Sequence, residues 1–175
     1  ARTAEKARGA LAPFGGTTVG LECELSEPKS VRASVKTVKA ALGGGKVDAI
    51  ICNAGIMALP QLEQVNGLEK HFVTNHLGHF LLVNRLLDRV VAAPQGRVVV
   101  VSSRGYLWAP PEGIEFDNLS GRRGEYDPNR AYGQSKLANG LFSLELARRL
   151  GGTRATANSV HPGIIRTNLG RHFPR

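Results

Sequence analysis

Residues 97–103 read RVVVVSS, and this stretch decides the fold class. Its four consecutive valines are β-branched and stand between turn-forming residues, which predicts a short buried strand over Arg97–Val101. Two serines follow the strand directly. In open sheets of parallel strands, ligands bind beyond the carboxyl ends of the strands. The serine pair therefore marks a candidate site at the end of this strand.

Outward from this strand, apolar strand-like runs alternate with helical patterns along the whole chain. Val47–Cys52 has the composition of a strand buried on both faces, and Thr156–Val160 predicts a last strand. The remaining segments are predicted as helices at Thr3–Leu11, Ser26–Leu42, Gly67–Ala93 and Ala131–Leu150, a strand at Thr17–Cys23, and loops at Asn53–Asn66 and Arg104–Asn129. This alternation predicts βαβ units and an α/β fold with helices on both faces of a parallel sheet.

Polar residues, glycine or proline follow each of the last three predicted strands. The stretch Asn53-Ala54-Gly55 follows one, Ser102-Ser103 the next and His161-Pro162-Gly163 the last. Because the carboxyl ends of parallel strands meet at one edge of a sheet, we expect these segments to lie close together. Their convergence predicts a ligand site at that edge.

Length and composition limit the remaining possibilities. The chain has 175 residues, of which 42% are hydrophobic, enough for one globular core and too few for two full domains. Its formal net charge of +9 is compatible with nucleic acid or an anionic membrane as a partner. The basic residues are scattered and have no interleaved aromatic series, so the sequence favours a solvated surface and predicts no nucleic-acid partner.

Two cysteines, Cys23 and Cys52, each end an apolar run. Sparse cysteine indicates a reducing compartment such as the cytoplasm and favours free thiols over a disulfide between the two. No apolar run approaches the roughly 20 residues that cross a bilayer, so no membrane span is expected in this segment. The chain opens on Ala1 without an initiator Met, which leaves a signal or an anchor upstream open.

Tyr132 and Lys136 are four residues apart in a predicted helix, so their side chains share one face. A phenol ionises near pH 10, and a neighbouring ammonium lowers that pKa, which yields an acid/base group for alcohol and carbonyl chemistry. A hydroxyl such as that of Ser103 could hold the substrate oxygen. The pair alone is weak evidence, because a half-buried tyrosine and a solvated lysine are common on helices.

The combination of motifs is far more specific. In chain order they are Asn53-Ala54-Gly55, Asn75 within TNHLGHF (74–80), Val101-Ser102-Ser103, YGQSK (132–136), and Pro162-Gly163 followed by Thr167. This set resembles the short-chain dehydrogenase/reductase family over nearly the whole chain. NHLGHF (75–80), AYGQSKLAN (131–139), HPGIIRT (161–167) and the long interval before Tyr132 resemble its retinol dehydrogenase-like branch. Protochlorophyllide reductases and WW-domain oxidoreductases share much of this signature, which leaves the substrate open.

The resemblance implies a Rossmann-type, doubly wound parallel sheet seen without its first β-α-β segment. The glycine-rich fingerprint of the family is missing, and Gly43–Gly45 cannot replace it because it follows a helix and precedes a strand. We therefore expect residues 1–175 to form a single partial domain. On this expectation the chain starts just after the family's second strand and stops before its substrate-covering helix.

The resemblance also implies a role for each matched residue. Tyr132 exchanges a proton with the substrate oxygen, Lys136 lowers its pKa and binds the nicotinamide ribose, and Ser103 orients the substrate. Asn75 holds a kinked helix turn and a water that connects Lys136 to solvent. The expected cofactor contacts are Asn53, Ala54, Gly55, Pro162, Gly163, Thr167, and Glu24 in place of the family's usual adenine-binding Asp.

Arg2 falls where members that prefer NADP carry an arginine for the 2′-phosphate, which favours NADP, with NAD as the alternative. A plain surface arginine is the competing interpretation of Arg2. His76 and His79 are expected to pack against neighbouring helices or line a dimer face, and no metal site is expected because no cysteine or paired carboxylate stands nearby.

The leading hypothesis is hydride transfer between NADP(H) and a small alcohol or carbonyl substrate, lipophilic in character, in a chain that forms a homodimer. A sugar-nucleotide epimerase-like enzyme and a non-catalytic nucleotide-binding scaffold are the alternatives. Intact Asn75, Ser103, Tyr132 and Lys136 argue against the scaffold.

Overall fold

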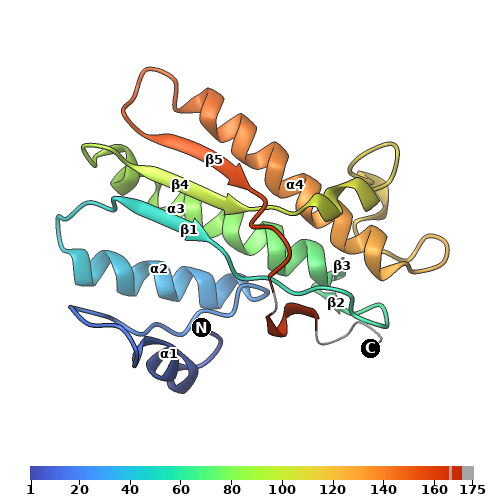
Figure 1. The fold of residues 1–175 in the computed structure, drawn as a ribbon, viewed down its shortest axis with the longest axis horizontal. Helices are drawn as coiled ribbons and strands as arrows, with labels where there is room; N and C mark the ends of the chain where they lie inside the picture. The colour runs from blue at the N-terminus through green and yellow to red at the C-terminus, as the bar shows by residue number, and fades with distance from the viewer. Residues whose placement is uncertain (166, 171–175) are drawn as a thin grey trace.

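The computed structural model describes residues 1–165 and 167–170 (Figure 1). Its centre is a three-stranded parallel sheet in the order β1 (Ala49–Cys52), β4 (Arg97–Val101) and β5 (Thr156–Val160). In the register of this sheet, Cys52 lies opposite Val100, and Val101 lies opposite Val160. The carboxyl ends of all three strands therefore meet at one edge, and the Rossmann-type arrangement predicted from the sequence is confirmed.

Three helices, α2 (Pro28–Leu42), α3 (Gly78–Val91) and α4 (Pro128–Arg149), pack on the sheet and on one another (Figure 1). Helix α3 contacts β1 and β4, and α4 contacts β4 and β5. The core between these elements is aliphatic and includes Val35, Ile50, Val83, Leu86, Val98, Val100 and Leu146. Burial of such side chains is the main favourable contribution to folding.

The prediction that the first strand of the sheet is buried on both faces is wrong. Burial alternates along β1, where Ile50 and Cys52 are buried and Ile51 is 67% exposed. Successive side chains of a strand point to opposite faces. Helices α2, α3 and α4 cover the face of Ile50 and Cys52. Within the described residues the face of Ile51 stays open, so the helices predicted for both faces are seen on one face only.

The predicted strand at Thr17–Cys23 is not formed. A strand needs a neighbour that satisfies its backbone groups. The N-terminal amino group of Ala1 donates to the Leu21 carbonyl at 2.9 Å, and the Cys23 amide donates to the Ala1 carbonyl at 2.6 Å, which is a single step of parallel pairing. Apart from this step, no strand of the described part of the chain lies beside the segment. Helix α1 (Ala4–Leu11) begins as predicted, with Thr3 as its N-cap.

The helix predicted from Gly67 begins later, because residues 64–69 form a hairpin of β2 (Gln64–Val65) and β3 (Leu68–Glu69). Asn66 and Gly67 make its turn, with φ of 51° and 79°. An Asn-Gly pair with two positive φ angles is the preferred two-residue hairpin turn. A π-helical segment, η1 (Phe72–Leu77), then leads into α3.

Helix boundaries elsewhere shift by a few residues. Both α2 and α4 start on a proline, and the Asp127 side chain caps α4 by accepting from the amides of Asn129 and Arg130. The predicted loop at 104–129 contains two short 3₁₀ helices, η2 (Arg104–Trp108) and η3 (Phe116–Asn118), and a third, η4 (Asn168–Gly170), follows β5. Within residues 1–165 and 167–170, no helix is both long enough and apolar enough to cross a membrane.

Candidate active site

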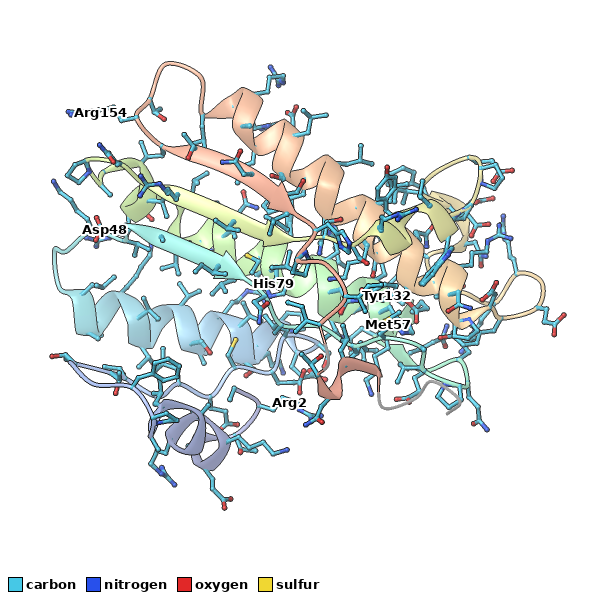
Figure 2. All side chains as sticks on the ribbon, viewed as in Figure 1. Arg2, Asp48, Met57, His79, Tyr132 and Arg154 are labelled. Carbon is cyan, nitrogen blue, oxygen red and sulfur yellow. The ribbon has the colours of Figure 1, made fainter. Side chains whose placement is uncertain are left out.

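Tyr132 and Lys136 are both buried side chains of α4. Figure 2 shows Tyr132 beside α4, beyond the ends of the strands. The Lys136 ammonium donates to the Val101 carbonyl at 2.9 Å and lies 5.6 Å from the centroid of the Tyr132 ring. The four-residue spacing brings both side chains to the strand end where Ser103 follows. The structure thus gathers the three residues in one place.

The two serines after β4 make different contacts. Ser102 extends the sheet, since its amide donates to the Val160 carbonyl at 2.9 Å, and its hydroxyl donates to the Lys136 carbonyl at 2.8 Å. The Ser103 hydroxyl accepts from the Gly105 amide at 3.0 Å and hydrogen-bonds the Tyr132 side chain. Of the two hydroxyls, that of Ser103 is therefore the one placed beside the phenol.

Burial determines the protonation states of Tyr132 and Lys136. Desolvation raises the pKa of Tyr132, and the hydrogen bond with Ser103 acts in the opposite direction. Desolvation lowers the pKa of Lys136 from 10.5 to about 8. The sequence-based expectation of a lowered Tyr132 pKa therefore differs from the structure, because burial of the ring opposes the charged phenolate. At neutral pH the site holds a neutral phenol, which is a proton donor.

The Lys136 pKa predicts how stability depends on pH. The unfolded chain keeps this proton up to pH 10.5 and the folded chain loses it near 8, so between these values the unfolded state binds more protons and the free energy of unfolding rises with pH. In Lys136→Met this rise should be absent. Urea unfolding of the full-length protein at pH 7, 8, 9 and 10 measures the free energy of unfolding of wild type and variant. Both proteins contain Cys52, so its contribution to the pH dependence cancels when the two curves are subtracted.

Lys39→Met is the matched control, because Lys39 lies on the surface of α2 in an exposed pair with Asp88. We expect this variant to keep the rise of wild type. A rise that is equally large in Lys136→Met would show that the ammonium is not desolvated in the folded protein.

Asn75 connects the loop after β1 to α4. It is fully buried in the π-helical segment, and its side chain accepts from the Ile56 amide at 2.8 Å and donates to the Ile56 carbonyl at 3.0 Å. Its amide also donates to the Ser135 hydroxyl at 2.9 Å, which in turn donates to the Tyr132 carbonyl at 2.7 Å. The extra residue of a π-turn is common at functional sites, and here it directs Asn75 toward this chain of contacts.

The residues predicted to touch a cofactor lie around the same edge of the sheet. A Cβ on Gly55 would stand 3.0 Å from the Asn75 side-chain oxygen and 3.7 Å from the Lys136 ammonium, so glycine permits a close approach there. Asn53, Ala54, Pro162, Gly163 and Thr167 are all exposed at this edge. The Thr167 hydroxyl accepts from the Leu169 amide at 3.2 Å.

Arg2 and Glu24 are the two residues predicted to contact the adenosine part of the cofactor. Arg2 is exposed and lies apart from Tyr132 in Figure 2. The Glu24 carboxylate accepts from the amide and hydroxyl of Ser26, at 3.1 and 2.9 Å. Glu24 is therefore engaged within its own turn, and its contact to adenine remains a prediction.

Three buried residues of the site were missed in the sequence. Ser135 relays between Asn75 and Tyr132, and Asn139 donates to the Val101 carbonyl at 3.3 Å beside Lys136. Both share the helix face of Tyr132, three and seven residues on, and that spacing was the available signal. Gly133 was also missed. It lets α4 approach the backbone of η2 closely, and sequence spacing does not reveal that contact.

His76 and His79 pack between helices. The His76 ring contacts Phe72, Phe80 and Phe142, and burial lowers its pKa from 6.5 to about 4. The His79 ring donates to the Asn75 carbonyl at 2.9 Å. Among the described residues, no group of three or more His, Cys, Asp or Glu side chains is arranged to hold a metal ion. Cys23 and Cys52 are free thiols.

A cavity of about 270 Å³ opens beside Ser103 and Lys136. Its other walls come from α4, from η2 and from the end of β5. Leucines of α4 stand there with the polar Arg104 and His161, and Tyr132 is not among the lining residues. Leu137, Leu141, Leu144 and Val160 give the cavity an apolar side that could contact the apolar part of a ligand.

The family follows from a direct comparison. The family model described as short chain dehydrogenase matches residues 1–112. The chain belongs to the short-chain dehydrogenase family. Human retinol dehydrogenase 14 is 44% identical over 158 residues, which are 90% of this chain and 45% of that protein. The chain thus falls in the retinol dehydrogenase-like branch of the family, and it spans about half the length of such relatives.

Solved structures agree with the family fold. An uncharacterised protein from Mycobacterium paratuberculosis is 37% identical with a TM-score of 0.79, over 98% of this chain and 60% of that one. RhlG from Pseudomonas aeruginosa, solved as an active-site complex with NADP, is 25% identical with a TM-score of 0.69, over 97% of this chain and 61% of its own. The fold of this chain is thus that of the short-chain dehydrogenases.

Proposed function

We propose that this chain carries the proton-transfer site of an NADP(H)-dependent reductase for lipophilic carbonyl compounds. The observation that carries the proposal is the buried, neutral Tyr132 phenol between the Ser103 hydroxyl and the Lys136 ammonium. A phenol held neutral at pH 7 is suited to giving a proton to a carbonyl oxygen that is becoming an alkoxide. The reductive direction is therefore the one that this protonation state favours.

Each residue has a separate task in this proposal. The Ser103 hydroxyl and the Tyr132 phenol both hydrogen-bond the substrate oxygen, and Tyr132 transfers its proton to that oxygen as the carbonyl carbon is reduced. The phenolate left behind is stabilised by the Lys136 ammonium, whose pKa of about 8 also allows it to return a proton. Asn75 and Ser135 hold the backbone of Tyr132 in position. A bound nicotinamide cofactor would supply the hydride.

The residues at the sheet edge fit such a cofactor. Gly55 leaves room beside Asn75 and Lys136 that a side chain would fill. Asn53, Ala54, Pro162, Gly163 and Thr167 are exposed around it. We assign the nicotinamide ribose to Lys136, and the 2′-phosphate of NADP to the exposed guanidinium of Arg2, because a guanidinium matches a phosphate dianion.

Fluorescence titration of the full-length protein with NADPH and NADH tests the cofactor assignment. Arg2→Ala should raise the Kd for NADPH about 10-fold and leave that for NADH unchanged, because the charge-assisted contact is to the 2′-phosphate alone. Arg8→Ala, an exposed arginine of α1, is the matched control and should change neither. Binding of neither nucleotide by the folded protein would overturn the reductase assignment in favour of a scaffold.

The leucine-lined side of the cavity beside Ser103 and the similarity to retinol dehydrogenase 14 support a lipophilic substrate. A screen of lipophilic aldehydes and ketones against small polar ones tests the substrate class, and preference for the polar set would contradict it.

Homodimerisation and a cytoplasmic location belong to the same proposal. Phe80 is 45% exposed on α3, and its ring lies tilted against that of Phe142 on α4 with centroids 5.2 Å apart, which supports a dimer surface there. Analytical sedimentation of the full-length protein and of its Phe80→Asp variant would measure the oligomeric state of each.

A further inference from the structure

A carboxylate–imidazole pair lies buried directly against Tyr132, and the reaction proposed above does not use it. Glu69 and His71 are 3% and 0% exposed, and His71 Nδ1 lies 2.7 Å from a Glu69 oxygen. The His71 ring meets the Tyr132 ring edge-on, with centroids 6.3 Å apart and planes at 78°. A buried ionisable pair is costly to maintain, so its position against the phenol calls for an explanation.

The hydrogen bonds fix one form of the imidazole. The Leu59 amide donates to His71 Nε2 at 3.4 Å, so Nε2 accepts and the ring proton is on Nδ1, where it is donated to Glu69. The second Glu69 oxygen accepts from the Phe72 amide at 2.9 Å. The Tyr126 hydroxyl lies 3.5 Å from His71 Nδ1 and also hydrogen-bonds Glu69. Both Glu69 oxygens thus have donors, and both His71 nitrogens have partners.

The Leu59 end of this chain of contacts holds a strained loop. Ala58 is buried and has φ of 52°, a left-handed conformation that side chains other than glycine rarely adopt. Such strain persists only where the surroundings impose it. Asn75 holds Ile56 on one side of Ala58, and His71, four residues before Asn75 on the same face, holds Leu59 on the other.

We propose that Glu69 and His71 are positioning residues for Tyr132: the carboxylate fixes the imidazole, and the imidazole fixes both the 56–59 loop and the edge of the phenol ring. The proposal rests on the proposed reductase function. Asn75 still anchors Ile56 without the pair, so residues 53–55 keep their place. Loss of the pair therefore affects turnover and leaves cofactor binding intact.

The test compares two substitutions at one position in the full-length protein. His71→Phe keeps a ring against Tyr132 and removes both polar atoms, whereas His71→Gln keeps one donor and one acceptor. We expect His71→Phe to lower kcat by about 10- to 100-fold with the Kd for NADPH within about twofold of wild type. His71→Gln should restore kcat to within about threefold. The Leu59 amide should exchange its hydrogen quickly in His71→Phe and slowly in His71→Gln.

Glu69→Gln is the second arm and carries the test if His71→Phe does not fold. A carboxamide oxygen cannot replace both carboxylate oxygens as acceptors, so kcat should fall as in His71→Phe. Equal kcat in His71→Phe and wild type, equal loss in His71→Phe and His71→Gln, or losses that match only the folded fraction would each overturn the proposal. A wild-type protein without reductase turnover would instead overturn the proposed function, so the two failures are distinguishable.

Discussion

Tyr132→Phe should lower kcat for carbonyl reduction by about 10³-fold, the largest effect on activity that we expect. The variant removes one oxygen atom from a buried ring and leaves the contacts to His71 and Trp108 in place. General acid catalysis contributes on the order of 10²- to 10⁴-fold to a reaction rate. Within the described site no other group that could donate the proton hydrogen-bonds Ser103 from the position of the phenol. Steady-state kinetics with saturating NADPH in the full-length protein measures the effect.

The Kd for NADPH is the internal control for Tyr132→Phe. The phenol oxygen is not among the groups assigned to the nucleotide, so binding should stay within about twofold of wild type. A loss of kcat below about 10-fold would contradict the role of Tyr132 as the proton donor. Weaker NADPH binding together with a lower kcat would indicate that the phenol maintains the structure of the site and does not donate the proton.

Gly133→Ala should destabilise the protein by about 3 kcal/mol, the largest effect on stability among our predictions. A Cβ at this position would lie 2.6 Å from the Ala109 nitrogen, 2.7 Å from the Trp108 carbonyl carbon and 2.8 Å from the Gly105 oxygen. All three are backbone atoms, so no side-chain rotation relieves the overlap. Helix α4 must move away from η2, and Tyr132 must move with it.

Gly140→Ala is the matched control in the same helix. A Cβ there meets nothing within 4 Å, and alanine is the better helix former by about 1 kcal/mol. This variant should therefore be as stable as wild type or slightly more so. Urea unfolding and thermal melting compare the two variants. Equal stability of Gly133→Ala and Gly140→Ala would contradict the close approach of α4 and η2.

Sequence patterns were sufficient to predict the helices and strands that bury one apolar side against the sheet. The valines of β4 and the apolar spacing of α2, α3 and α4 report burial against a sheet, and parallel pairing then brings the ends of β1, β4 and β5 together. The spacing of Tyr132 and Lys136 likewise requires only helix geometry.

Features that depend on a partner elsewhere in the chain were not predictable in this way. Thr17–Cys23 has strand composition but lacks a paired neighbour, and Asn66-Gly67 competes locally with the helix pattern that follows it. The direction of the Tyr132 pKa depends on how much water the folded site excludes. The contact of His71 with Tyr132 joins segments about sixty residues apart, and spacing cannot reveal it.

The pairing of β4 with β5 has a consequence during synthesis. Translation adds about 5–20 residues per second, so Thr156–Val160 leaves the ribosome several seconds after Arg97–Val101. Until then the Ser102 amide lacks the Val160 carbonyl, and the valine strand has one open edge. Non-local parallel pairing is also slow to form. In the nascent chain, the valine strand therefore needs protection from aggregation for those seconds, and Ser103 reaches its final place among the last residues of the site.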